Sequence, residues 1–136
     1  MQINVIALIL VCLVSVFQTS SPVKPGQTLV EVWCGGDDNL TQGVCHAVYN
    51  ECTASPDFVM SSDEKPRTLI VRIPTNVDWK EERGRTRVFY KVEFKSTNGK
   101  KLGTKKGSCW ENEPGTCAAQ IMKQAKIVAR KLNTNH

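Results

Sequence analysis

The sequence predicts one mixed α+β domain with an antiparallel sheet, stabilised by disulfides. Three observations support this class: strand-like alternation before an Asn98-Gly99 turn, an amphipathic segment near the C-terminus, and five cysteines that follow an apolar N-terminal segment. The expected order of elements is a strand, a helix, three strands and a C-terminal helix.

The N-terminal segment is typical of a signal peptide. Residues 5–17 are uncharged and mostly apolar, which suits a signal-peptide core but is too short for a transmembrane helix. A buried core helix is the alternative. We expect residues 1–20 to be a signal peptide and residues 21–136 to form a single secreted domain. No later segment is apolar enough to anchor that domain, so we expect no stable membrane insertion.

The first half of the domain carries two strand signals and one helix signal. Val30 and Val32 alternate with Glu31 and Trp33, which is typical of a strand. Farther on, apolar residues recur at helical spacing, and a β-branched run follows a stretch rich in Ser, Asp and Pro. We expect a strand over 28–34, a helix over 42–52, a long loop over 53–67 and a strand over 68–73.

The clearest hairpin follows a charged turn over 78–85. Asn98-Gly99 favours a type I′ turn, with the partner strand beginning at Lys100. In the strand before the turn, alternation predicts an inward set of Val88, Tyr90, Val92 and Phe94, and an outward set of Arg87, Lys91, Glu93 and Lys95.

The C-terminal segment predicts an amphipathic helix that starts near Pro114, with Thr116 as its N-cap. One face gathers apolar residues: Cys117, Ile121, Ala125, Val128 and Leu132. The opposite side gathers Lys123, Lys126 and Arg130. That basic stripe is either an ordinary solvated helix face or a surface for a partner.

The cysteine count favours an oxidising destination. Cys12 leaves with the signal peptide, so five cysteines remain and at most two intramolecular bridges can form. From the sequence the pairing stays open, and the fifth thiol is either free or bridged to another chain. Cys45, His46 and Cys52 lack the spacing of structural zinc sites, so we expect no metal. Asn39-Leu40-Thr41 is a glycosylation acceptor, which places Asn39 at the surface if it is modified.

Charge is divided unevenly along the chain. Residues 22–79 hold four basic and eight acidic side chains, a net −4, whereas residues 80–136 hold fourteen and five, a net +9. Such asymmetry predicts a basic face that attracts phosphates or acidic surfaces. The alternative is a lysine-rich surface that serves only solubility.

The sequence indicates no catalytic site and no cofactor. His46 is expected on a helix surface, and His136 is the terminal residue, which is poorly suited to hold a proton-transfer geometry. Serine nucleophiles lack an elbow motif, and no phosphate-binding glycine loop precedes a helix.

Over residues 30–117 the chain resembles the ribonuclease-like secreted effectors of plant-pathogenic fungi, which are similar to the small guanyl-specific fungal ribonucleases. The resemblance is carried by the order and spacing of short elements. They are Trp33 next to Cys34, the set Val44, Ala47, Val48 and Cys52, the run 87–90, Asn98-Gly99, Leu102-Gly103-Thr104, and Cys117.

This resemblance implies a helix packed on a twisted antiparallel sheet, with the segment after Cys117 as an added helix and a possible partner surface. It also implies a bridge from Cys34 to Cys117, which would contribute about 4 kcal/mol in the chain-entropy model. Cys45 with Cys109 is then the favoured second bridge, with Cys52 left as a buried small apolar residue.

The residues that depart from the family pattern predict loss of its chemistry. Arg87 matches the arginine-bearing strand, but Arg72 stands near the place of the catalytic glutamate, and residues 103–107 hold no histidine. General acid–base cleavage needs two groups of suitable pKa, and arginine stays protonated. The resemblance therefore implies a catalytically inactive ribonuclease-like scaffold.

The resulting hypothesis is a secreted monomeric effector that binds host RNA or a host protein, either outside host cells or after uptake into them. The expected contact residues are Arg83, Arg85, Arg87, Lys91, Lys95, Lys100, Lys101, Lys105 and Lys106, with Trp79 and Trp110 for base stacking or for packing. The alternatives are an active ribonuclease with a different base and acid, a killer-toxin-like or antimicrobial protein, and a structural or ligand-masking protein.

Overall fold

The computed structural model describes residues 23–61 and 65–134. The predicted signal peptide, residues 1–20, and His136 lie outside the described residues. The elements are β1 (Thr28–Cys34), α1 (Asn39–Ala54), β2 (Phe58–Met60), β3 (Thr68–Ile73), β4 (Asp78–Glu82), β5 (Arg85–Ser96), β6 (Lys101–Trp110) and α2 (Pro114–Thr134).

The fold is α+β as predicted, with a C-terminal helix, but the sheet is mixed rather than antiparallel. Its strand order is β2-β1-β3-β5-β4, and β6 pairs with β5. β1 runs parallel to β2 and to β3, whereas the pairs that involve β5 are antiparallel. The predicted antiparallel pairing is wrong for β1, because the 16-residue helix α1 connects this strand to the next one. A helical crossover of that kind returns the chain to the same end of the sheet, so the next strand runs parallel.

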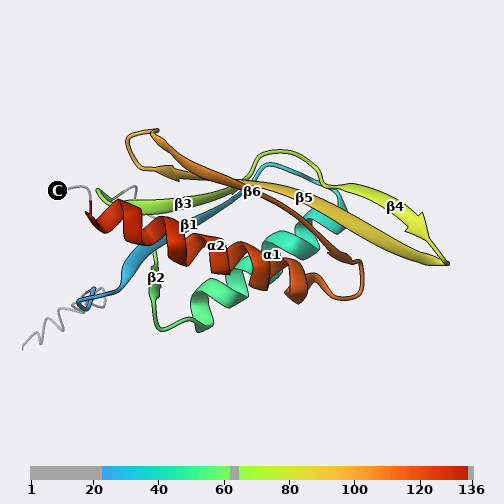
Figure 1. The fold of residues 1–136 in the computed structure, drawn as a ribbon, viewed down its shortest axis with the longest axis horizontal. Coiled ribbons are helices and arrows are strands. Elements are labelled where there is room, and N and C mark those ends of the chain that lie inside the picture. Colours follow the sequence, from blue (N-terminus) through green and yellow to red (C-terminus); the bar gives the residue numbers. More distant parts are fainter. Residues whose placement is uncertain (1–22, 62–64, 135–136) are drawn as a thin grey trace, which may run out of the picture.

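Both helices pack on the same face of the sheet, side by side (Figure 1). α1 contacts β1 and β2, and α2 contacts β5 and β6. The fully buried side chains of the sheet include Val30, Leu69 and Phe94, and they meet Val48 of α1 and Ile121 of α2. The layer between the helices and the sheet is therefore the hydrophobic core.

The inward set predicted for β5 is confirmed, because Val88, Tyr90, Val92 and Phe94 are all buried. The predicted apolar face of α2 is confirmed as well. Cys117, Ile121, Ala125 and Val128 are fully buried, and Leu132 packs partly buried against the same core. Alternation and helical periodicity identified these positions because each element buries one side only.

Two short strands were missed. β2 lies inside the predicted loop 53–67 and has only three residues. β4 lies inside the predicted charged turn 78–85, and four of its five side chains are exposed. A strand that buries almost no side chain has no alternating apolar pattern, so β4 can be recognised only from its ladder with β5.

α1 begins earlier than predicted, and α2 begins at Pro114 as predicted but without the predicted cap. Asp38 is the N-cap of α1, and its carboxylate accepts a hydrogen bond from the backbone N–H of Thr41 at 2.7 Å. α2 begins at Pro114, so the predicted cap at Thr116 is wrong. Proline is favoured in the first turn because it has no N–H to leave unpaired and its φ is already helical.

The disulfides join Cys34 to Cys45 and Cys109 to Cys117. These are the four cysteines predicted to be bridged, but the expected pairing of Cys34 with Cys117 and of Cys45 with Cys109 is wrong. Each bridge instead joins the end of a strand to the helix that follows it, across Cα–Cα distances of 6.0 and 5.4 Å. With sequence separations of 11 and 8, each loop contributes about 2.5–3 kcal/mol in the chain-entropy model.

Cys52 is the remaining cysteine of the described residues, and it is free and fully buried, as predicted. Its Sγ lies 3.4 Å from Sδ of Met122 across the interface between α1 and α2. Burial raises the pKa of the Cys52 thiol to about 12, so the folded protein keeps this group neutral.

We predict that digestion without reduction will yield peptides that join Cys34 to Cys45 and Cys109 to Cys117. An alkylating reagent at neutral pH will label Cys52 only after unfolding, because the native thiol is buried and neutral. Mass spectrometry of the peptides reads both results. A peptide that joins Cys34 to Cys117 would contradict the observed pairing.

We also predict that Gly107→Ala will lower the free energy of unfolding by about 1–3 kcal/mol. A Cβ at this position of β6 would clash with the hydroxyl of Tyr90 and lie 2.6 Å from Oε1 of Gln120 on α2. The matched control is Gly43→Ala in α1, whose Cβ would meet no atom within 4 Å and should stabilise the helix by about 0.5–1 kcal/mol. Urea unfolding measures both, and equal effects of the two changes would contradict this packing.

Candidate nucleic-acid interface

The face of the sheet opposite the helices carries the outward side chains of five strands, and we call it the open face. It is defined by Glu31 and Trp33 of β1, Ile70 and Arg72 of β3, the even-numbered residues 78–82 of β4, the odd-numbered residues 85–95 of β5, and Lys101, Thr104, Lys106, Ser108 and Trp110 of β6. Cross-strand partners point to the same side of a sheet, so the observed register fixes this set.

A hollow of about 490 Å³ lies on the open face over β5 and β6. Its lining includes Phe89, Lys91, Lys106 and Ser108, with Asp78 from β4. Phe89 is 38% exposed, which is unusual for a phenylalanine on a central strand. The hollow thus combines an accessible aromatic ring with two ammonium groups and the carboxylate of Asp78, the cross-strand partner of Phe89.

Lys91 and Lys106 are direct cross-strand partners, and both are exposed. Among the described residues neither lysine has an ion-pair partner. Like charges placed opposite each other destabilise a sheet, and an anion bound between them would relieve that repulsion. The pair is therefore the best-placed cationic group for a ligand of the hollow.

Two arginines extend the positive charge along the open face. The guanidinium carbons of Arg85 and Arg87 lie 4.1 and 5.0 Å from the ring centroid of Trp110. Arg87 also donates hydrogen bonds from Nε and Nη2 to Oγ of Ser108, at 3.2 and 3.0 Å. Trp110 therefore orients the two arginines, and its ring is already stacked by protein groups.

The nine basic residues predicted as a continuous strip do not all lie together. The open face brings together Arg85, Arg87, Lys91, Lys95, Lys101 and Lys106. Arg83 lies in the turn between β4 and β5 and Lys100 in the turn between β5 and β6, and Lys105 pairs with buried Val92 on the helix side. Lys95 is partly neutralised by Glu93, at 3.7 Å.

The predicted stacking residue Trp79 does not join the hollow. It is 59% exposed, but it pairs with Val88 and therefore points to the opposite side of the β4–β5 ladder from Phe89. Phe89 itself was missed by the sequence analysis, although its odd-numbered place between Val88 and Tyr90 puts it in the outward set.

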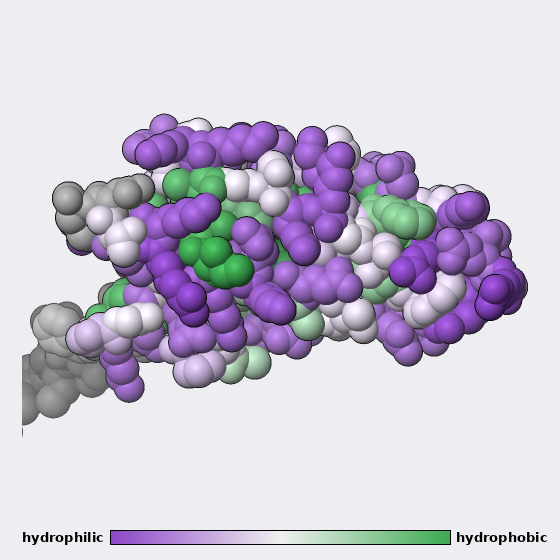
Figure 2. Space-filling model, viewed as in Figure 1, coloured by the Kyte–Doolittle hydropathy of each residue, from purple (hydrophilic) through white to green (hydrophobic). Residues whose placement is uncertain are grey.

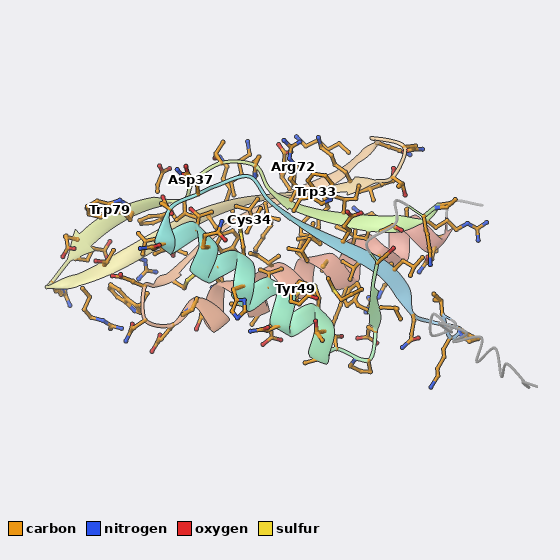
Figure 3. All side chains as sticks on the ribbon, turned by 180° about the vertical axis from the view of Figure 1, so that it is seen from behind. Trp33, Cys34, Asp37, Tyr49, Arg72 and Trp79 are labelled. Carbon is orange, nitrogen blue, oxygen red and sulfur yellow. A yellow bond between two sulfur atoms is a disulfide. The ribbon has the colours of Figure 1, made fainter. Side chains whose placement is uncertain are left out.

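Trp33 and Arg72 form a second exposed pair on the open face. They are partners in the β1–β3 ladder and lie next to each other on the side of the strands away from the helices (Figure 3). Trp33 is 50% exposed. In the sequence, Trp33 belongs to the elements that carry the resemblance and Arg72 to the departures from it, and only the parallel register makes them neighbours.

The predicted absence of a ribonuclease-type site was based on Arg72 and on the histidines. The structure pairs Arg72 with Glu93 of β5 in the same row of the open face. His46 is exposed on α1, in the helix layer. No described histidine therefore shares the open face with a carboxylate. Of the described residues, no group of three or more His, Cys, Asp or Glu is placed to hold a metal ion.

The glycosylation acceptor Asn39 is exposed in the first turn of α1 rather than in a loop. Thr41 of the same motif is fully buried, and its Oγ1 accepts a hydrogen bond from the backbone N–H of Val77 at 2.9 Å. Modification of Asn39 stays a prediction.

Seen from the viewpoint of Figure 1, the surface is mostly hydrophilic, and hydrophobic residues form small separate patches (Figure 2). Within residues 23–61 and 65–134, no helix is long and apolar enough to cross a membrane. Two disulfides in a domain of this size are characteristic of proteins that mature in an oxidising compartment.

A scan against protein-family models found no match, and neither did a search of curated proteins. Among solved structures, a PelC variant from Paraburkholderia phytofirmans, crystallised as a dodecamer, is 16% identical with a TM-score of 0.47 and covers 81% of this chain and 95% of its own. A second PelC dodecamer structure from that organism is 16% identical with a TM-score of 0.45, covering 77% and 91%. A minor lipoprotein from Acinetobacter baumannii is 12% identical with a TM-score of 0.45, covering 84% and 95%. Similarities of this size assign no function to the chain.

Proposed function

We propose that the protein is a secreted, non-catalytic binding protein that holds single-stranded RNA on the open face of its sheet. The observation that carries the proposal is the hollow in which exposed Phe89 lies beside Lys91 and Lys106, two lysines with no ion-pair partner in the described part of the chain. The resemblance to secreted fungal effectors adds host RNA as the target. Because the sheet and the disulfide pairing differ from what that resemblance implies, the proposal depends on the open face.

Single-stranded RNA suits this surface because its bases and phosphates need different contacts. Bases stack on accessible aromatic rings, each for about 1–3 kcal/mol, and phosphates are drawn to lysine and arginine. An aromatic ring on a sheet face is a common platform for unpaired bases. Phe89 supplies the ring, and Lys91 and Lys106 form the next cross-strand pair on the same face.

The proposal excludes cleavage because, among the described residues, the open face carries carboxylates such as Glu31, Asp78 and Glu93 but no histidine that could serve as the acid. Cleavage of RNA needs one group to take the proton of the 2′-hydroxyl and another to protonate the leaving oxygen. Arg72 stays protonated and cannot be the base, and Glu93 of the same row is engaged by Lys95. His46 lies on α1 in the helix layer, too far around the molecule to serve as the acid of this face.

We predict that a labelled uridine octamer will bind the protein in a fluorescence anisotropy titration. Its affinity should fall as the salt concentration is raised, and the octamer should remain uncleaved. Phe89→Ala should weaken binding by about 5- to 150-fold, with Phe89→Leu no better, because stacking and not apolar contact is lost. Lys91→Gln with Lys106→Gln should reduce the slope of log K against log salt by about 1.4.

The matched control is Lys123→Gln with Lys131→Gln. It removes the same charge from exposed positions of α2, in the opposite layer. An equal loss in this control would show that net charge alone attracts the RNA, and cleavage of the octamer would favour the active-ribonuclease alternative. If no RNA binds, a host protein or a microbial surface becomes the better partner for the basic face.

A further inference from the structure

We infer that Trp33 and Arg72 form a second RNA-binding subsite, which takes a base and a phosphate of the strand that is held at Phe89. This inference rests on the proposed function and extends the RNA-binding surface across the open face to β3 and β1. The juxtaposition of an exposed indole and an exposed guanidinium on neighbouring strands is the observation that carries it.

Trp33 is held outward by its surroundings. Val30 of the same strand points into the core, fully buried, and fixes the phase of β1. Directly after Trp33, Cys34 is bridged to Cys45 of α1, and the N–H of Gly35 donates a hydrogen bond to the carbonyl of Ile73 at 2.7 Å. The end of β1 is therefore tied to α1 and to β3. A ring that is fixed before binding loses little freedom when a base stacks on it.

Arg72 is available for a phosphate. It is exposed, and it has no ion pair among the described residues. Its other cross-strand partner, Glu93, lies 3.7 Å from Nζ of Lys95. The planar guanidinium can bind a phosphate through two parallel hydrogen bonds, while the adjacent indole stacks on the base.

The two subsites are separated by a distance that an oligonucleotide can span. Arg72 pairs with Glu93, four residues along β5 from Phe89, and Trp33 lies two strands away from β5. These steps are about 13 Å along the strand and about 10 Å across the sheet, or about 16 Å on the diagonal. A strand of a few nucleotides covers this distance, so a longer oligonucleotide reaches both rings and a very short one reaches one.

The test compares a uridine trimer with a uridine octamer on the full-length mature protein. Trp33→Ala should lower the affinity for the octamer by about 5- to 150-fold and change that for the trimer by less than about twofold. Trp33→Phe should restore most of the loss, because the phenyl ring still stacks. Arg72→Gln should weaken octamer binding and lower its salt dependence, since one phosphate contact is lost.

The matched control is Trp79→Ala, which removes an equally exposed tryptophan from the other side of the β4–β5 ladder and should leave both affinities unchanged. Thermal melting of each variant shows that it is folded. If Trp33→Ala leaves octamer binding intact while Phe89→Ala removes it, the second subsite is wrong and the proposed function stands. If the unaltered protein binds neither oligonucleotide, both are wrong.

Discussion

The close packing of α2 against the β5–β6 hairpin is the interaction on which the rest of the structure depends. Gly107 lets the helix approach, and the hydroxyl of Tyr90 donates to Oε1 of Gln120 at 2.9 Å while Nε2 of Gln120 donates to the carbonyl of Ser108 at 3.1 Å. The disulfide between Cys109 and Cys117 fixes the start of the helix against the same hairpin. These contacts also keep the hydroxyl of Tyr90 away from solvent, which raises its pKa to about 12.

Because α2 joins α1 on one face, the hydrophobic core lies wholly on that side of the sheet. The strands are then free to carry other chemistry on the open face, where Phe89 is exposed between Arg87 and Lys91 of the same strand and Trp33 is exposed beside Arg72. An exposed aromatic ring costs free energy in water, and two unpaired lysines side by side repel each other. Both costs are relieved by a ligand that offers flat bases and negative charge, which is the physical reason for favouring RNA.

The sequence was sufficient for elements that bury one side and insufficient for pairings between distant segments. Alternation identified the inward set of β5, and helical periodicity identified the core face of α2. β4 was not predicted because it buries almost no side chain. The parallel pairing of β1 was not predicted because the local sequence pattern does not indicate which strand lies beside it. The disulfide pairing inferred from the resemblance failed because local strand-to-helix closures, not a long-range bridge, bring the sulfurs together. Trp33 and Arg72 are 39 residues apart in the chain, so only the register makes them neighbours.

The most direct test of the account is a map of backbone amide chemical shifts during titration of the isotope-labelled protein with a uridine octamer. The account predicts that the largest changes lie at Phe89, Lys91 and Lys106 and continue to Trp33 and Arg72, with α2 unaffected. Changes confined to the basic stripe of α2, at Lys123, Lys126 and Arg130, would contradict the account, because they would place the ligand on the helix layer and leave the open face without a role.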